Sequence, residues 1–213
     1  MRTTLVPVVL PVPTSRSPRS AGVHASSLIR QIAIQIGKLK LDFVEELGLV
    51  DLSQEDWWNR LDKVAQLRIG MGLAFEEWYI PLLQHAIVDH PGELCIDGIF
   101  MTPDGESIDF VSVTEHAIHE VKLTYKSVNT VGDLTGEFMW ISQMQAYCRG
   151  AGTCVGFLHP LFVCGDYSWP MRPRLGPIEG KHYCWRVVFT EEEIERNWQA
   201  LRAVRDAQLE LGR

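Results

Sequence analysis

The sequence predicts an α/β fold in which helices flank a central mixed β-sheet. Short apolar or alternating segments indicate strands at about 93–101, 106–113, 116–125, 153–164 and 182–189. Segments with the 3.6-residue period of amphipathic helices precede, separate and follow these strands. The chain has 213 residues, of which 46% are hydrophobic and 22% charged, enough for one domain with a sizeable core.

Residues 1–22 are expected to lie outside the folded domain. They are rich in Pro, Ser and Arg, a composition typical of an extended arm, so the single domain is assigned to residues 23–213. Such an arm is a candidate contact for a partner subunit. No transmembrane stretch or signal peptide is evident, and we therefore expect a cytoplasmic protein that does not associate with membranes.

Two helical stretches are expected before the first strand. Apolar residues recur at mainly helical spacing over residues 26–47. A second stretch begins near Ser53, where Asp56 three residues later is a helix-start signal. It continues towards His90 with a break near Pro81, because proline cannot supply the backbone N–H that a helix interior needs.

The second half of the chain alternates strands with two helices. A turn at residues 102–105 is predicted to join the first two strands. One helix is expected at 136–149. The last helix begins with Thr190 and Glu193, a capping box in which each side chain accepts a hydrogen bond from the other residue's backbone N–H, and it runs to about Leu211.

Charged side chains interrupt two of the predicted strands. Asp97 lies in the apolar run 94–100, and Glu120 and Lys122 lie in the run 119–124. Strands exclude charges from buried positions unless the charges are paired. Alternation places Glu120 and Lys122 on one face of their strand. Two carboxylates that converge on a divalent cation, with an amine beside them, suit metal-assisted hydrolysis, so we expect these three side chains to gather in one cleft.

The formal net charge of −7 limits the partners that the protein can bind. It argues against a protein that covers nucleic acid with a broad basic surface. It does not exclude an enzyme that binds a few phosphates locally. Such an enzyme must concentrate basic residues near its site, and the candidates are Lys122, Lys126, Arg149, Arg172 and Arg174.

Three other interpretations concern the same part of the chain. A zinc site built from His116 and His119 fails, because residues three apart on a strand point to opposite faces. Asp104 and Asp109 lack the spacing of a calcium-binding loop and are interpreted as part of a hairpin tip. The third interpretation, that Glu120 forms only a solvated ion pair worth less than about 1 kcal/mol, stays open.

Four polar motifs follow one another along the chain, Gly-x-x-x-Glu, Asp, Glu-x-Lys and Gln-x-x-x-Tyr, and they consist of Gly72, Glu76, Asp97, Glu120, Lys122, Gln143 and Tyr147. Their order resembles that of the PD-(D/E)XK nuclease superfamily. Within it, the order is similar to the RecB-like and lambda-exonuclease-like branch, which includes phage recombination exonucleases. The resemblance implies a single restriction-endonuclease-like domain.

The resemblance also implies a role for each residue. Asp97 and Glu120 would bind a metal ion, and the backbone carbonyl of Val121 would add a ligand. Glu76 would hold a metal ion directly or through water. Lys122 would position or help to deprotonate the attacking water and would offset negative charge in the transition state.

The remaining implications concern geometry, cofactor and substrate. Gln143 and Tyr147 would steady the active site or contact the DNA backbone. The implied cofactor is Mg²⁺ or Mn²⁺. No iron–sulfur cluster is expected, because the five cysteines lack the spacing of the cluster-binding members. The implied activity is hydrolysis of DNA phosphodiester bonds in phage or prophage DNA processing or recombination, with an exonuclease favoured over an endonuclease.

An alternative from a different class is a virion structural or assembly protein that keeps the nuclease fold, with or without activity. In that case the arm at residues 1–22 would contact a phage assembly partner or a second copy of the chain. The protein would then belong to the virion as well as to the host cytoplasm.

Overall fold

The computed structural model describes residues 20–38, 63–83, 90–109, 112, 115–124, 134, 136–162 and 184–210. The predicted arm up to residue 19 lies outside these ranges, as do Lys126, Arg172 and Arg174. The elements in chain order are β1 (Val23–His24), α1 (Ala25–Gln35), α3 (Lys63–Tyr79), the 3₁₀ turn η2 (Ile80–Leu83), β2 (Leu94–Ile96), β3 (Ile99–Met101), β4 (Gly105–Ile108), β5 (His116–Thr124), α5 (Phe138–Ala151), β6 (Val155–Phe162), β7 (Trp185–Val188) and α6 (Glu191–Glu210).

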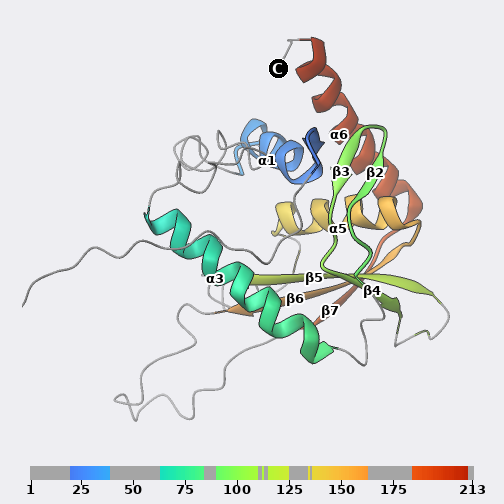
Figure 1. Cartoon of the computed structure of the whole chain (residues 1–213). Coiled ribbons are helices and arrows are strands. Elements are labelled where there is room, and N and C mark those ends of the chain that lie inside the picture. The colour runs from blue at the N-terminus through green and yellow to red at the C-terminus, as the bar shows by residue number, and fades with distance from the viewer. Residues whose placement is uncertain are drawn as a thin grey trace, which may run out of the picture.

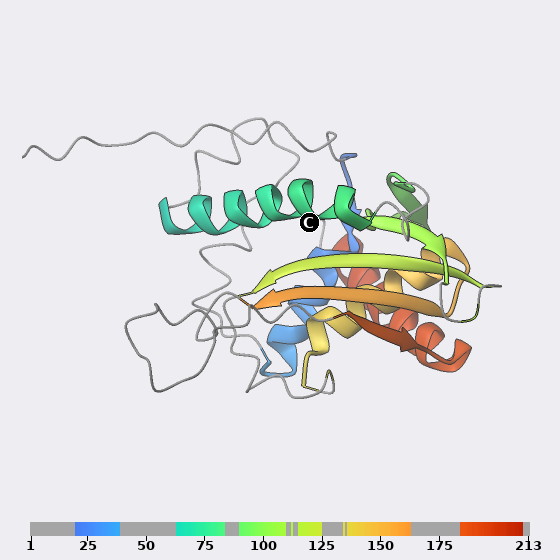
Figure 2. The same ribbon diagram turned by 90° about the horizontal axis from the view of Figure 1, so that it is seen from below.

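The elements form layers around a four-stranded mixed sheet with the order β4-β5-β6-β7 (Figure 1). Figure 2 shows α3 along one face of this sheet, with α1, α5 and α6 on the opposite side. On that side α5 packs on β5 and β6, and α1 and α6 pack on α5. The expected α/β fold is thus confirmed. None of the helices described by the structure has both the length and the apolar character needed to cross a bilayer.

The strands nevertheless form two sheets, where the sequence predicted one. The segment predicted as a single strand at 93–101 is a hairpin of β2 and β3, and these strands form a separate sheet with β1. The chain reverses at Asp97 and Gly98, which have φ values of 51° and 73°. Asp-Gly is a favoured pair for a two-residue hairpin turn, because both positions need positive φ. The predicted 106–113 strand is the shorter β4, and it pairs with β5 and not with 93–101.

Strand β5 is the centre of the molecule. It pairs antiparallel with β4 over 116–119 and parallel with β6 over its full length. The helix α5 makes the crossover that a parallel pair requires. Because β4 begins at Gly105, which lies opposite His119, the edge of β5 from Glu120 onwards has no β4 partner.

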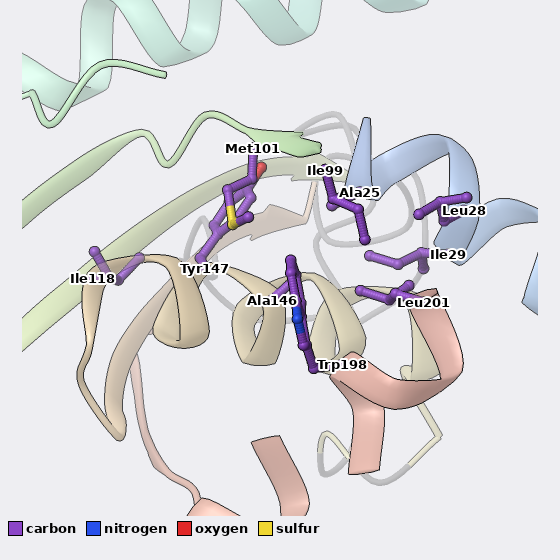
Figure 3. Packing of buried hydrophobic residues seen from close by; sticks show 10 residues of the cluster. All are labelled: Ala25, Leu28, Ile29, Ile99, Met101, Ile118, Ala146, Tyr147, Trp198 and Leu201. Carbon is purple, nitrogen blue, oxygen red and sulfur yellow. The ribbon is translucent and has the colours of Figure 1, made fainter. Parts of the chain in front are cut away.

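The largest cluster of buried apolar residues lies between α1, α5, α6 and the β2–β3 hairpin (Figure 3). The close approach of the hairpin to α5 depends on Gly150, where an added Cβ atom would lie 2.7 Å from the Met101 sulfur. The predicted capping box of α6 is confirmed. The backbone N–H of Thr190 donates to Glu193 at 2.8 Å, and the N–H of Glu193 donates to the Thr190 hydroxyl at 3.1 Å.

A pair of leucine-to-alanine substitutions on α6 tests this packing. Leu201 is fully buried in the main cluster, whereas Leu209 is exposed on the same helix. Leu201→Ala should lower the free energy of unfolding by about 3 kcal/mol, because it removes buried methyl groups and leaves a cavity. Leu209→Ala should change it by less than about 0.5 kcal/mol. Urea denaturation measures both, and equal effects would contradict the assigned packing of α6.

Candidate active site

The two faces of β5 have different neighbours. Ile118 packs with α5 in the main core, whereas Val121 packs with Phe75 and Tyr79 of α3. Because side chains alternate along a strand, Glu120 and Lys122 share the face of Ile118. The prediction that these two charged residues lie on one face of their strand is therefore confirmed.

Glu120 and Lys122 form a buried ion pair. The Lys122 ammonium donates a hydrogen bond to Oε1 of Glu120, and the side chains are 24% and 1% exposed, respectively. The interpretation as a solvated surface pair is thus excluded. The second carboxylate oxygen, Oε2 of Glu120, is buried and has no hydrogen-bond partner in the described part of the chain. A buried carboxylate oxygen without a donor favours a cation at that position.

Asp104 is the second carboxylate of this cluster. It precedes β4 by one residue, and Gly105 pairs with His119, so continuing the register places Asp104 opposite Glu120. Its Oδ2 atom accepts a hydrogen bond of 2.7 Å from the backbone N–H of Val121. The N–H and C=O of one strand residue point to the same side. The carbonyl of Val121 therefore faces the same open edge of β5 as the Asp104 carboxylate.

The charge of Glu76 on α3 also acts on this cluster. Glu76 is half-buried on the helix that packs across Val121. Its carboxylate is close enough to raise the pKa of Glu120 and of Lys122 by its charge. The predicted approach of Glu76 from a neighbouring helix is thus consistent with the structure.

The electrostatics of the cluster favour a bound cation. Burial, and then the charge of Asp104, raise the pKa of Glu120 to about 8, although Lys122 opposes this shift. Burial alone would lower the pKa of Lys122, but attraction to Glu120 and Asp104 outweighs it and keeps the amine protonated. Among the described residues, the charges of Glu120, Asp104 and Glu76 all act on the Lys122 ammonium. A divalent cation would offset the negative charge of these carboxylates and hold Glu120 ionised.

The residue types fit Mg²⁺ or Mn²⁺. These ions prefer carboxylate, carbonyl and water oxygens, and Mg²⁺ commonly binds only one or two protein carboxylates. Within the described ranges, no three His, Cys, Asp or Glu side chains are already gathered as a metal centre. A site here would therefore combine Asp104, Glu120 and the Val121 carbonyl with water, while Glu76 acts on it through its charge.

Asp97 is not part of this cluster, and the expectation that it lies beside Glu120 is wrong. It sits in the β2–β3 turn, where its Oδ2 atom accepts a 2.9 Å hydrogen bond from the indole N–H of Trp198. Arg202 lies 3.7 Å from the same oxygen, and the Asp97 side chain is 40% exposed. The hydrogen bond from Trp198 holds the pKa of Asp97 below its ordinary value. Asp97 thus fastens the hairpin to α6.

The sequence did contain a signal for Asp104. It lies in Thr102-Pro-Asp-Gly105, which was interpreted as a simple turn and hairpin tip because this tetrapeptide favours a β-turn. Pro103 and Asp104 also match the first two residues of the PD-(D/E)XK motif, which gives its name to the superfamily that the sequence resembles. Asp97, which follows an isoleucine, lacks that proline.

Gln143 and Tyr147 lie on α5, on the side of the sheet that carries Glu120. The Gln143 side-chain amide donates a 2.6 Å hydrogen bond to the Tyr147 hydroxyl, which confirms that they share a helix face. Tyr147 is buried in the main core beside Ile118. Arg149, which was expected near the site, instead lies 3.4 Å from Glu195 of α6.

The opposite face of β5 carries a second buried polar group. His119 contacts the Ser107 hydroxyl of β4 at 2.7 Å and His159 of β6 at 2.9 Å. Burial, and then the charge of His116, lower the pKa of His119 to about 4, so the ring is neutral near pH 7. The sequence excluded a zinc site at His119, but no sequence pattern indicated its hydrogen bonds to Ser107 and His159.

Comparison with known proteins agrees with this fold. No protein-family model matches the chain, and no curated protein matches it significantly. Several solved structures do match, and exonucleases are among them. An alkaline exonuclease from Laribacter hongkongensis has a TM-score of 0.52 at 15% identity, over 90% of this chain and 89% of that chain. A phage-related exonuclease from Haemophilus somnus 129PT has a TM-score of 0.50 at 14% identity, over 87% and 92%. The chain therefore has the α/β fold of these exonuclease structures, as predicted.

The raised pKa of Glu120 predicts a pH dependence of stability in the absence of metal. The pKa is about 8 in the folded chain against an ordinary value of 4.5. The folded state therefore binds this proton more tightly than the unfolded state does. The resulting stabilisation of the folded state is full below about pH 4.5 and is lost as pH rises through 8. Glu120→Gln should abolish this component, which amounts to a few kcal/mol, since one pKa unit corresponds to about 1.4 kcal/mol.

The measurement is urea denaturation in EDTA between pH 5 and 9. The matched control is Glu192→Gln, because Glu192 is exposed on α6. The difference in unfolding free energy between wild type and Glu120→Gln should change across this range. An unchanged difference would contradict the burial assigned to Glu120.

Proposed function

We propose that this chain is a divalent-metal-dependent deoxyribonuclease that hydrolyses DNA phosphodiester bonds. One observation carries the proposal: the buried Glu120 carboxylate, beside Asp104 and the Lys122 ammonium, has an oxygen to which no group among the described residues donates. Two carboxylates next to an amine are the chemistry expected of metal-assisted phosphodiester hydrolysis. The fold shared with two exonuclease structures supports the assignment.

Asp104 and Glu120 would hold the metal ion, with the Val121 carbonyl as a further ligand and Glu76 as a ligand directly or through water. The Asp104 carboxylate and the Val121 backbone face the edge of β5 that β4 leaves uncovered, next to Glu120, and the charge of Glu76 acts on Glu120. When bound, the metal ion would polarise the scissile phosphate and lower the pKa of a bound water. Asp104 takes the role that the sequence assigned to Asp97, because Asp97 is held at α6.

Lys122 would act on the nucleophile and on developing charge. Its pKa is raised by the surrounding carboxylates, so it carries a positive charge in the metal-free chain. As an ammonium it would orient an attacking water by hydrogen bonding and offset negative charge that accumulates on the phosphate oxygens. To deprotonate the water, Lys122 would first have to release its own proton, which the charges of Glu120 and Asp104 oppose.

Gln143 and Tyr147 would steady the site from α5. Tyr147 is buried against Ile118 of β5, and its hydroxyl is held by Gln143. This placement favours support of β5 over direct contact with the DNA backbone. For the substrate, we propose DNA ends in phage or prophage DNA processing, because two of the solved structures that share the fold are exonucleases and one of these is phage-related. The nuclease domain would span residues 23–213.

Nuclease assays on paired aspartate variants test the assignment of the metal ligand. Asp104→Asn should lower kcat by about 10²–10³-fold or more, because it removes a charge that binds the metal. Asp97→Asn should retain activity near the wild-type level, since Asp97 contacts α6. Lys122→Met should lose most activity. Linear and closed circular DNA are each incubated with Mg²⁺, Mn²⁺ or EDTA, and product formation is followed on gels.

The substrate pattern then separates the remaining possibilities. Digestion of linear DNA alone indicates an exonuclease, and digestion of both forms indicates an endonuclease. Loss of activity in Asp97→Asn but not in Asp104→Asn would contradict the assignment of Asp104. A wild-type protein that leaves every substrate intact with all metals would favour the alternative of a non-catalytic virion protein with a nuclease fold.

Metal binding itself should stabilise the folded chain. At a Mn²⁺ concentration about a hundred times the dissociation constant, the free energy of unfolding should rise by about 2.7 kcal/mol relative to EDTA. The gain should be lost in Glu120→Gln and Asp104→Asn and kept in Asp97→Asn. It should also be smaller at pH 5.5 than at pH 8, because Glu120 must release its proton to bind the ion. Thermal denaturation measures these shifts, and stabilisation of all variants alike would place the metal elsewhere.

A further inference from the structure

A buried chain of hydrogen bonds crosses three neighbouring strands on the face of the sheet opposite Glu120. Ser107 of β4, His119 of β5 and His159 of β6 are each at most 2% exposed. His119 contacts Ser107 at 2.7 Å and His159 at 2.9 Å, and the two imidazole rings stack with their centroids 5.2 Å apart. These side chains take no part in the proposed chemistry, so their burial needs another explanation.

The direction of each hydrogen bond follows from the donors that are present. The Ser107 hydroxyl donates its single proton to the Ile108 carbonyl at 2.8 Å. Its oxygen must therefore accept from His119, which places the His119 proton on Nε2. The Nδ1 atom of neutral His119 then accepts from Nε2 of His159. The side-chain hydrogen bonds thus run in one direction, from His159 of β6 to His119 of β5 and from His119 to Ser107 of β4.

This chain fixes the register of β4 on β5. In the observed register His119 lies opposite Gly105, and Ala117 lies opposite Ser107. The Ser107–His119 bond is therefore a diagonal contact between positions two residues apart. A slip of two residues would keep every side chain on its present face, so burial alone does not exclude it. The diagonal bond disfavours a slip that moves Ser107 opposite Glu115, because the hydroxyl would then lie four positions from the imidazole. A slip in the other direction would turn the diagonal contact into a directly opposed pair and would move Asp104 away from Glu120.

The same register places Asp104 at the site. Asp104 precedes Gly105 by one residue, and its carboxylate accepts from the Val121 N–H at 2.7 Å. The network also contacts α3, because the ring of Tyr79 lies 5.9 Å from the His159 ring and packs with Val121. The three elements that contribute Asp104, Glu120 and Glu76 thus all contact this network.

We propose that the Ser107–His119–His159 chain is a positioning device that holds Asp104 beside Glu120, with His119 as its central positioning residue. Its purpose, assembly of a metal site, rests on the proposed function. The arrangement of the site's carboxylates then depends on hydrogen bonds made on the other face of the sheet.

The test compares two serine-to-alanine variants that are matched in burial. Ser107 and Ser142 are each 1% exposed, and each hydroxyl donates a part-buried hydrogen bond. The Ser142 hydroxyl of α5 donates to Asn197 of α6 at 2.6 Å. Both variants should lower the melting temperature by a similar amount. Ser107→Thr, which keeps a hydroxyl at the same position, serves as the rescue variant.

Two readouts separate positioning from stability. In metal-free protein, the Val121 amide should exchange with solvent at least about tenfold faster in Ser107→Ala than in Ser142→Ala, because its acceptor Asp104 is no longer held. Ser107→Ala should also weaken Mn²⁺ binding, measured by calorimetry, by about tenfold, while Ser142→Ala leaves it unchanged. Ser107→Thr should recover both values.

Failure of this inference and failure of the proposed function have different signatures. Equal Val121 exchange in the two alanine variants overturns the positioning device, whatever the metal affinity. Unaltered Mn²⁺ binding in Ser107→Ala overturns its role at a metal site that the wild type still forms. Wild-type protein that binds no Mn²⁺, together with faster Val121 exchange in Ser107→Ala, supports the positioning of Asp104 and overturns the proposed function alone.

Discussion

The arrangement of the site depends on the burial of one carboxylate. Glu120 lies in the central strand of the sheet, where it is shielded from water and paired with the Lys122 ammonium, and the charges of Asp104 and Glu76 raise its pKa. Such a group is costly to ionise without a cation, since one of its oxygens has no hydrogen-bond donor in the described structure. Glu120 is buried because β5 is packed on both faces, by α3 and by α5.

The strand pattern around β5 converts this constraint into a candidate active site. β6 covers one edge of β5 along its whole length, whereas β4 covers the other edge only as far as His119. The uncovered edge begins at Glu120, and it is filled by the carboxylate of Asp104. Asp104, the turn residue that precedes the short strand β4, therefore lies beside the polar groups of the longer strand β5. The buried histidines on the far face hold that short strand in place.

Much of this arrangement could be predicted from the sequence, and the failures have physical causes. Alternation alone placed Glu120 with Lys122, helical spacing placed Gln143 with Tyr147, and the capping box located the start of α6. Asp97 was misplaced because a run of seven residues looked like one strand, whereas the Asp-Gly pair within it turns the chain back. Asp104 was missed because it lies in a tetrapeptide with strong turn propensity, which was interpreted only as a turn and not as a candidate ligand. Contacts between distant segments, such as Trp198 with Asp97, leave no local pattern.

Anomalous scattering from crystals of the chain soaked in Mn²⁺ would test the proposed metal site, because it locates the ion without any assay of activity. We expect one principal peak bounded by the carboxylates of Asp104 and Glu120 and by the Val121 carbonyl, on the uncovered edge of β5. A peak at Asp97 beside α6, or no peak between Asp104 and Glu120 at saturating Mn²⁺, would contradict it.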